Sequence, residues 1–248
     1  MSHIIGYKKN WYKEWFGEEY LTVYKHRDDK DAQKLIALIL SQIKIDKSSY
    51  LLDLACGNGR HAFLLSGYSP HVYGLDLSVH LLHQAQNRKK SEKAPSFVRA
   101  DMRYFPFRIK FDVIFSLFTS FGYFDDDDKH LKVALEISES LNEGGSFVLD
   151  YFNPAYVRKN LVPDGKRMID STEITEKRWL EKKRVFKSIH IQSEGEDKEF
   201  IESVRMFELD ELTVLLEKAG IFIREVFGNY KGDRYKPDSK RMIIFAKK

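Results

Sequence analysis

The sequence predicts an α/β fold, with a mostly parallel sheet and helices on both of its faces, on three observations. Short apolar runs that suit buried strands alternate five times with amphipathic stretches that suit helices. The first apolar run, residues 51–55, breaks into a glycine turn and resumes as a helix start. The next two runs end in single carboxylates, Asp76 and Asp101. Because ligands bind at the carboxyl ends of strands in open α/β sheets, these side chains are expected at a binding edge.

Length and composition indicate one globular protein. The chain has 248 residues, of which 43% are hydrophobic and 31% charged, and a formal net charge of +4. That length is enough for one large domain with a full core, and the mild positive charge requires no nucleic acid. The single cysteine, Cys56, excludes an internal disulfide, no Cys/His cluster has zinc-site spacing, and no run is as long as a membrane span. We therefore expect a cytoplasmic protein without a metal or a membrane contact.

Residues 1–45 are predicted to form an N-terminal helical cap. Aromatic side chains recur at helical spacing between residues 7 and 26, namely Trp11, Trp15, Phe16, Tyr20 and Tyr24. They suit packing of the cap on the main domain. Tyr20 and Tyr24 also suit a lid over the ligand pocket, and both interpretations stay open. A second amphipathic helix is predicted from Asp31 to Ile43.

Residues 46–153 are predicted to be the ligand-binding core, which begins with a strand at Leu51–Ala55. Together with the turn that follows, this stretch reads Asp53-Leu54-Ala55-Cys56-Gly57-Asn58-Gly59, and Arg60–Leu65 then opens a helix. Glycines permit positive φ and close approach of a ligand, while the helix start presents free backbone N–H groups. The glycine spacing also fits a dinucleotide fingerprint. However, Asp53 would repel a pyrophosphate, so the turn favours a ligand that carries a cationic group.

The second strand of the core, residues 71–77, carries an acid at its end. Asp76 lies nineteen residues after Gly57. Nucleotide-binding folds place the acid that accepts ribose hydroxyls near this distance, although an isolated Asp at a strand end is more often a turn former or N-cap. Ser78 is predicted to be the N-cap of a helix that runs from Val79 to Lys90.

The rest of the core is predicted from the same alternation. The expected elements are a third strand at Ser96–Ala100, a fourth at Phe111–Phe118, a helix at Lys129–Leu141, a stop at Asn142–Gly145 and a fifth strand at Ser146–Asp150. The stretch 119–124 follows the fourth strand, where open α/β sheets bind substrate. Four acids, Asp125 to Asp128, complement the dipole at the start of the predicted helix and need no metal to account for them.

The alternation of predicted strands and helices ends after the core. Residues 165–207 are predicted to be an antiparallel β insertion, because alternating stretches at Trp179–Glu181, Val185–Ile191 and Phe200–Arg205 surround a polar turn. Residues 208–248 are expected to complete the sheet. They comprise a helix at Leu209–Gly220 and two strands at Ile221–Gly228 and Arg241–Ala246.

The glycine turn, together with Asp76 and Asp101, resembles the ordered motifs of class I S-adenosylmethionine (SAM) methyltransferases. The resemblance spans about residues 46–150 and returns in the last two strands. It is similar in particular to small-molecule enzymes that have an aromatic N-terminal cap and an antiparallel insertion. It implies a Rossmann-like, seven-stranded sheet with six parallel strands and one antiparallel strand. It also implies SAM as the cofactor, lying across the carboxyl ends of the first strands.

The resemblance assigns expected roles to individual residues. Asp53, Ala55, Gly57 and Gly59 would surround the methionine part, Asp76 the ribose, Leu77 and Met102 the adenine faces, Asp101 the adenine amine, and Ser116 and Leu117 the sulfonium side. Tyr20 and His61 are further candidates for cofactor contact. A surface or packing role is an equal alternative for His61.

The implied activity is transfer of a methyl group to a small-molecule acceptor by in-line displacement. Candidate acceptor contacts are Tyr24, Tyr123, Tyr151, Arg205 and Tyr230, and no catalytic base or oligomeric state is assigned. The fourth strand lacks the [DN]-P-P-[YF] sequence of enzymes that methylate planar amines of adenine or glutamine. One alternative is an RNA methyltransferase that binds RNA through the basic run 177–184. Because this run contains no RNA-binding motif, a nucleic-acid partner is the weaker expectation. The other is a non-catalytic SAM or S-adenosylhomocysteine binder or subunit.

Overall fold

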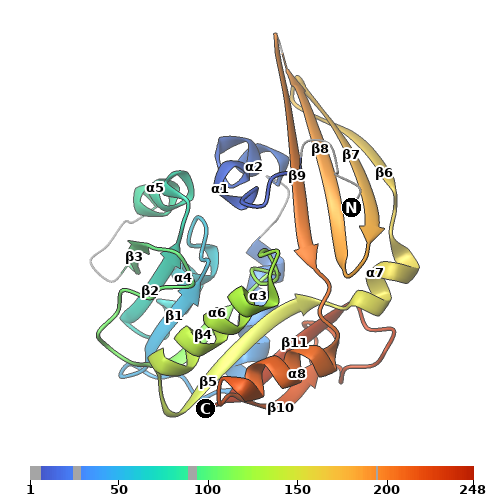
Figure 1. Cartoon of the computed structure of the whole chain (residues 1–248). Coiled ribbons are helices and arrows are strands. Elements are labelled where there is room, and N and C mark those ends of the chain that lie inside the picture. Colours follow the sequence, from blue (N-terminus) through green and yellow to red (C-terminus); the bar gives the residue numbers. More distant parts are fainter. Residues whose placement is uncertain (1–6, 25–28, 89–93, 194) are drawn as a thin grey trace.

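The structure is a computed structural model that describes residues 7–24, 29–88, 94–193 and 195–248. It contains a seven-stranded sheet with helices on both faces and a separate four-stranded sheet, which rises beside the carboxyl edge of the first (Figure 1). The α/β class predicted from the sequence is therefore confirmed. Within the described ranges, no helix has the length and apolar character needed to cross a membrane.

The large sheet has the strand order β10-β11-β5-β4-β1-β2-β3. Its strands are β1 (Tyr50–Leu54), β2 (His71–Asp76), β3 (Ser96–Arg99), β4 (Phe111–Ser116), β5 (Leu141–Phe152), β10 (Phe222–Phe227) and β11 (Arg241–Lys247). Strands β1 to β5 pair in parallel, whereas β11 is antiparallel to both β5 and β10. Six strands therefore run one way and β11 runs against them, as the resemblance implied.

Helices cover both faces of this sheet because alternate side chains of each strand point to opposite sides. Leu51 packs with α3 (Asp29–Gln42) and α4 (Arg60–Leu65), whereas its neighbour Leu52 joins the other core. That second core is covered by α6 (Asp127–Ser140) and α8 (Leu209–Lys218). Helix α5 (Val79–Asn87) lies against β2 and β3. Buried apolar residues on both faces are typical of a parallel sheet.

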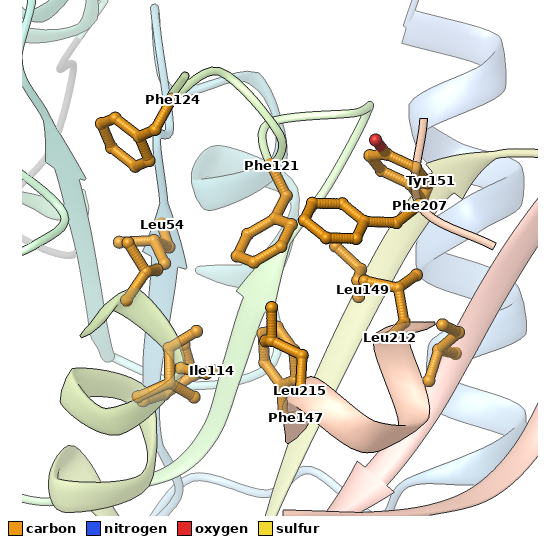
Figure 2. Packing of buried hydrophobic residues seen from close by; sticks show 14 of the residues in the cluster. Leu54, Ile114, Phe121, Phe124, Phe147, Leu149, Tyr151, Phe207, Leu212 and Leu215 are labelled. Atoms are coloured by element: carbon orange, nitrogen blue, oxygen red, sulfur yellow. The ribbon is translucent and has the colours of Figure 1, made fainter. Parts of the chain in front are cut away.

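The core next to α8 connects the large sheet with the segment that follows β9. Figure 2 shows Phe121, Tyr151 and Phe207 close together, with Leu212 and Leu215 of α8 below them. The Phe121 and Phe207 rings lie 5.8 Å apart, and all five residues are buried. Aromatic packing of this kind fixes the segment that leaves the four-stranded sheet against the large one.

The cap and the insertion are the two additions to this core. The cap contains α1 (Tyr12–Trp15) and α2 (Glu18–Val23), beside β9 in Figure 1. Helix α7 (Pro154–Asn160) leads from β5 into the antiparallel sheet. The strands of that sheet are β6 (Asp164–Ile169), β7 (Thr172–Glu181), β8 (Arg184–Ser193) and β9 (Glu196–Arg205), in that order.

Most predicted elements are present, and the differences have local causes. The predicted cap helix is broken into α1 and α2 around Gly17, and glycine inside a helix costs about 1 kcal/mol relative to alanine. The predicted stop 142–145 is a bulge inside β5, because the register shifts there. Ser78 caps α5 as predicted, accepting from the Leu81 N–H at 3.1 Å. The predicted end of that helix, Lys90, lies outside the described residues.

Two further elements escaped the sequence analysis. Helix α7 begins at Pro154, with the Asn153 side chain accepting from the Ala155 N–H at 3.1 Å. This pairing of Asn at the N-cap with Pro at the first helical position is a sequence signal that could have revealed the helix. Strand β6 is an exposed edge strand with little apolar character, and its pairing with β7 gives it its conformation.

Candidate active site

A cavity of about 1200 Å³ opens at the carboxyl ends of β1, β2 and β4. The cap covers it on one side, and β8 and β9 of the insertion close another. Eleven of the predicted site residues line it: Tyr20, Tyr24, Ala55, Gly57, His61, Asp76, Leu77, Asp101, Met102, Leu117 and Tyr123. Three parts of the chain that are distant in sequence therefore meet around one space.

The glycine turn after β1 forms the floor of the cavity. Gly57 and Gly59 have φ values of +55° and +77°, which residues with a Cβ atom rarely adopt. A Cβ atom on Gly59 would also lie 2.6 Å from the Phe97 ring. Gly59 does not line the cavity, so packing against β3 explains the glycine at this position. Ala55 adopts φ +56° despite its Cβ, which adds backbone strain to the same turn.

Two buried carboxylates lie below and beside this turn. The Oδ2 atom of Asp53 has no hydrogen-bond partner among the described residues, and burial raises the pKa of Asp53 to about 7. Asp76 accepts from the Gly57 N–H and the Ser78 N–H, each at 2.8 Å, yet burial still raises its pKa. A cationic ligand would offset the cost of burying these charges. The observed pair therefore fits a ligand that carries ammonium or sulfonium charge.

His61 lies at the start of α4, directly after the glycine turn. The imidazole is buried, and burial followed by the nearby charge of Arg60 lowers its pKa to about 3. Its Nε2 atom has no hydrogen-bond partner within the part of the chain that the structure describes. The ring is therefore neutral, it has one polar atom without a partner among the described residues, and His61 is part of the cavity lining.

Asp101 and Met102 follow β3 and line the cavity beside Asp76. The Asp101 carboxylate accepts from Arg103 Nε at 2.9 Å and from the Arg103 backbone N–H at 3.0 Å. Although burial alone would raise the pKa of Asp101, these hydrogen bonds leave it lowered. A charged carboxylate here has lone pairs left to accept a further donor, such as an exocyclic amine.

The far end of the cavity carries a polar cluster on the inner face of the insertion. Glu202 of β9 accepts from Trp15 Nε1 at 2.5 Å and from the Tyr24 hydroxyl at 3.0 Å. Lys187 Nζ of β8 lies 3.2 Å from the same carboxylate and also contacts the Tyr24 hydroxyl. The cap and the insertion are therefore joined by one carboxylate that lines the cavity.

Six predicted site residues do not line the cavity. Three of them lie in the elements that form the floor of the cavity. Asp53 belongs to β1, Ser116 to β4, and Gly59 to the turn between β1 and α4. Tyr151 donates its hydroxyl hydrogen to the Arg205 carbonyl inside the core. The Arg205 side chain pairs with Glu211 at 3.0 Å and with Asp127 at 3.3 Å. Tyr230 donates to Asp150 at 2.9 Å. Tyr151, Arg205 and Tyr230 therefore have internal partners and do not line the cavity.

Other lining residues were missed by the sequence analysis. Glu202, Lys187 and Arg241 line the cavity although each looks like an ordinary surface residue in its strand. Phe118 and Thr119 also line it, and only the stretch that contains Thr119 was expected there. Side-chain alternation could have placed Lys187 and Glu202 on particular faces of their strands. No pattern in the sequence indicated which face of the insertion lies against the cap.

Comparison with known proteins agrees with this geometry. A family model described as a methyltransferase domain matches residues 51–145. The cypemycin N-terminal methyltransferase of a Streptomyces species is 25% identical over 218 residues, which cover 85% of this chain and 87% of that protein. The dTDP-3-amino-3,4,6-trideoxy-alpha-D-glucopyranose N,N-dimethyltransferase of Streptomyces venezuelae is 30% identical over 111 residues. These cover 45% of this chain and 46% of that protein.

A solved structure supports the fold over almost the whole chain. It is a SAM-dependent methyltransferase from Clostridium acetobutylicum, with a TM-score of 0.79 and 21% identity. The match covers 92% of this chain and 97% of that one, so it extends far beyond residues 51–145. This structural match shows the fold, and the matched methyltransferase domain and the two curated relatives show that the chain is a SAM-dependent methyltransferase, with SAM as its cofactor.

Proposed function

We propose that the enzyme transfers the methyl group of SAM to an amine of a small molecule held between the cap and the insertion. The observation that carries this proposal is one cavity that runs from Asp76, beside the glycine turn, to the Glu202 cluster. The printed names of the two curated relatives support nitrogen as the acceptor atom, since one methylates an N-terminus and the other forms an N,N-dimethyl product.

In this proposal, residues 46–153 hold the cofactor, residues 1–45 and 165–207 enclose the acceptor, and residues 208–248 complete the sheet. Asp53 and the turn 55–59 would hold the methionine part, and Asp76 the ribose hydroxyls. Leu77, Asp101 and Met102 would hold the adenine. Tyr20, His61, Ser116 and Leu117 would close the space around the sulfonium. The lone pairs left on Asp76 and the unpartnered oxygen of Asp53 support these roles.

The acceptor would lie against Tyr24 and Tyr123, within reach of Glu202. An ammonium group can bind both a carboxylate and the faces of aromatic rings. The cations nearest this end are already engaged, because Lys187 pairs with Glu202 and Arg178 pairs with Glu176. This charge distribution supports an amine more than an anionic acceptor.

SAM, when bound, supplies a methyl group that its sulfonium already activates. The side chains then have two tasks, which are to align the acceptor nitrogen and to exclude water. The aromatic cap suits both, since Trp11, Phe16, Tyr20 and Tyr123 form a chain of ring contacts over the cavity. An amine must also lose its proton before it attacks. We assign no group to that step.

A nucleic-acid partner has no place in this proposal. Two arginines of the basic run 177–184 are turned to internal partners. Arg178 contacts Glu176, and Arg184 donates to the Phe124 carbonyl and Ser203 Oγ, both at 2.7 Å. The buried lone thiol of Cys56 supports a reducing setting, and we propose the cytoplasm.

The activity can be tested with tritiated SAM. The purified enzyme would be incubated with amine-bearing small molecules, with their N-acetylated counterparts, with total RNA and with unfolded protein. We expect label in the free amines alone. Label in the acetylated compounds would contradict nitrogen as the acceptor atom. Labelled RNA or protein, or bound SAM with no labelled product, would contradict a small-molecule enzyme.

The ribose role of Asp76 gives a separate prediction. Asp76→Ala should weaken SAM binding by about 1.5–3 kcal/mol, because it removes a charged hydrogen-bond acceptor. Calorimetric titration with SAM would measure the loss, and circular dichroism would verify folding. Asp112→Ala is the matched control, since Asp112 accepts from the Tyr50 N–H at the opposite end of β1. Equal losses in both variants would contradict a direct ribose contact.

A further inference from the structure

The chain adopts an unfavourable backbone conformation directly after β4. Phe118 and Thr119 have φ values of +63° and +66°, in the left-handed region. That region is costly for residues other than glycine, and most of all for a β-branched residue such as Thr. Both residues line the cavity. Strained backbone persists only where neighbouring groups hold it in place.

Asp150 is the group that holds this turn. It is fully buried near the end of β5, and its Oδ2 accepts from the Phe118 N–H at 3.0 Å. Its backbone carbonyl accepts from the Thr119 N–H at 2.8 Å. Arg241 donates through Nε to Asp150 Oδ1 at 2.5 Å and through Nη2 to Thr119 Oγ1 at 3.0 Å. Tyr230 adds a hydrogen bond to Oδ2 at 2.9 Å. The Asp150 carboxylate, on β5, therefore joins the turn after β4, strand β11 and the loop before β11.

The turn also touches the residues that follow the glycine turn. The Arg60 guanidinium lies 4.7 Å from the centre of the Phe118 ring, and the His61 ring lies 6.4 Å from it. The Arg241 guanidinium lies 5.8 Å from the same ring. A change in the backbone at Phe118 would thus move a side chain that packs on the start of α4. The geometry couples Asp150 to the floor of the cavity without placing it in the cavity lining.

We propose that Asp150 is a positioning residue for the SAM site, which holds Phe118 and Thr119 in their left-handed conformations and so completes the wall beside the glycine turn. The inference rests on the proposed placement of SAM in this cavity. It requires that Asp150 matters because the turn is strained. When the strain is removed, the site should depend less on Asp150.

A double-mutant cycle tests this dependence directly. Asp150→Asn should weaken SAM binding about tenfold, because the amide cannot accept from all three donors and the turn relaxes. Thr119→Gly is the second single variant, because glycine adopts this φ freely, and its own effect on affinity, which includes loss of the hydrogen bond from Arg241 to Thr119 Oγ1, enters the cycle as a measured value. The double variant should recover most of the lost affinity. Calorimetric titration with SAM gives the affinities, and thermal melting verifies folding.

Lys182→Gly is the matched control for the rescue. Lys182 also has a positive φ, +54°, but lies in the turn between β7 and β8 and does not line the cavity. It should raise the melting temperature of Asp150→Asn without restoring SAM affinity. If Asp150→Asn does not fold, Arg241→Lys replaces it, because lysine cannot hold Asp150 and Thr119 together through one planar group.

The outcomes separate the two levels of the proposal. If wild-type protein binds no SAM, the proposed function fails before the inference is tested. If wild type binds SAM and Asp150→Asn binds it equally well, the inference is wrong. It is also wrong if Lys182→Gly restores affinity as well as Thr119→Gly does, since Asp150 would then act only through general stability.

Discussion

Asp53 shows how a single residue can be placed at an energetic cost that a ligand offsets. Its carboxyl is buried in β1, and burial raises its pKa to about 7, against 3.8 for the exposed group. In the ligand-free fold it therefore stays protonated below pH 7, whereas the unfolded chain ionises above pH 4. Its contribution to the free energy of unfolding accordingly falls as pH rises between these values. A cation bound nearby reverses the preference by favouring the ionised form.

This linkage predicts the pH dependence of SAM binding. Affinity should rise about tenfold between pH 6 and pH 8, because the ionised fraction of a group with a pKa near 7 changes about tenfold. Titrations in buffers of different ionisation enthalpy should show release of about one proton at pH 6 and almost none at pH 8. Asp53→Asn should remove the release that belongs to this carboxyl. Unchanged proton release in a folded Asp53→Asn protein would assign the titration to another group.

Gly59 supplies a second residue-scale prediction, which separates backbone strain from lost space. Gly59→Ala should lower the free energy of unfolding by about 2–4 kcal/mol, because it combines a positive φ with overpacking against Phe97. Gly144→Ala is the control, since Gly144 has a similar φ of +74° but nothing within 4 Å of the added Cβ. Denaturant unfolding measures both. Equal losses would mean that the contact with Phe97 contributes nothing.

At the scale of elements, the cap is attached to the molecule through aromatic and polar contacts. Trp15 is 1% exposed and packs on Phe200 of β9, with ring centroids 4.8 Å apart. The Trp15 and Tyr24 side chains also donate to Glu202. The cap therefore depends on the insertion, even though the two lie far apart in the sequence. Release of the cap from β9 would open the cavity.

This arrangement predicts that Glu202 controls how long SAM stays bound. Glu202→Gln should accelerate SAM dissociation about three- to tenfold, because it weakens the charge-assisted hydrogen bonds that fasten the cap. Stopped-flow displacement of SAM would measure the rate. Glu199→Gln is the control on the same strand, where the exposed Glu199 bonds only Ser188 among the described residues. If both variants release SAM at the wild-type rate, the cap is not held by this carboxylate.

Elements differ in how far local sequence specified them. The bounds of β1, β2 and β4 were predicted to within two residues, because runs of buried apolar residues identify strands covered on both faces. β6 was not predicted, because an edge strand with one solvated face needs its partner to define it. The cap forms two helices because Gly17 interrupts it. The helical spacing of the aromatic residues continues across Gly17, so the sequence did not indicate this break.

At the scale of the whole molecule, binding and folding are linked through the cavity. The cap, the large sheet and the insertion all line it, so one ligand would contact all three parts. A ligand that binds only the folded state stabilises that state by mass action. No single part encloses the cavity alone.

Thermal melting tests this linkage. SAM at a hundred times its dissociation constant should stabilise the protein by about 2.7 kcal/mol, which corresponds to a rise in melting temperature of about 5–10 °C. NAD at the same concentration should produce no rise, since its pyrophosphate is anionic and the buried carboxylates Asp53 and Asp76 favour a cationic ligand. A larger rise with NAD would overturn the cofactor assignment. A rise with SAM in one of two separate transitions would show that the cap or insertion melts independently.

The sequence by itself determined the α/β core, the glycine turn and the acids that follow β2 and β3. Strand periodicity, glycine conformation and charge are local properties, so they can be read from a short stretch of sequence without its tertiary contacts. Tertiary structure alone decided that Glu202 and Lys187 face Tyr24, that Arg205 pairs with Asp127, that Tyr151 bonds the Arg205 carbonyl, and that Asp150 bonds the turn after β4. Those relations join residues separated by tens of positions to more than a hundred. They depend on how whole sheets pack, which no local pattern specifies.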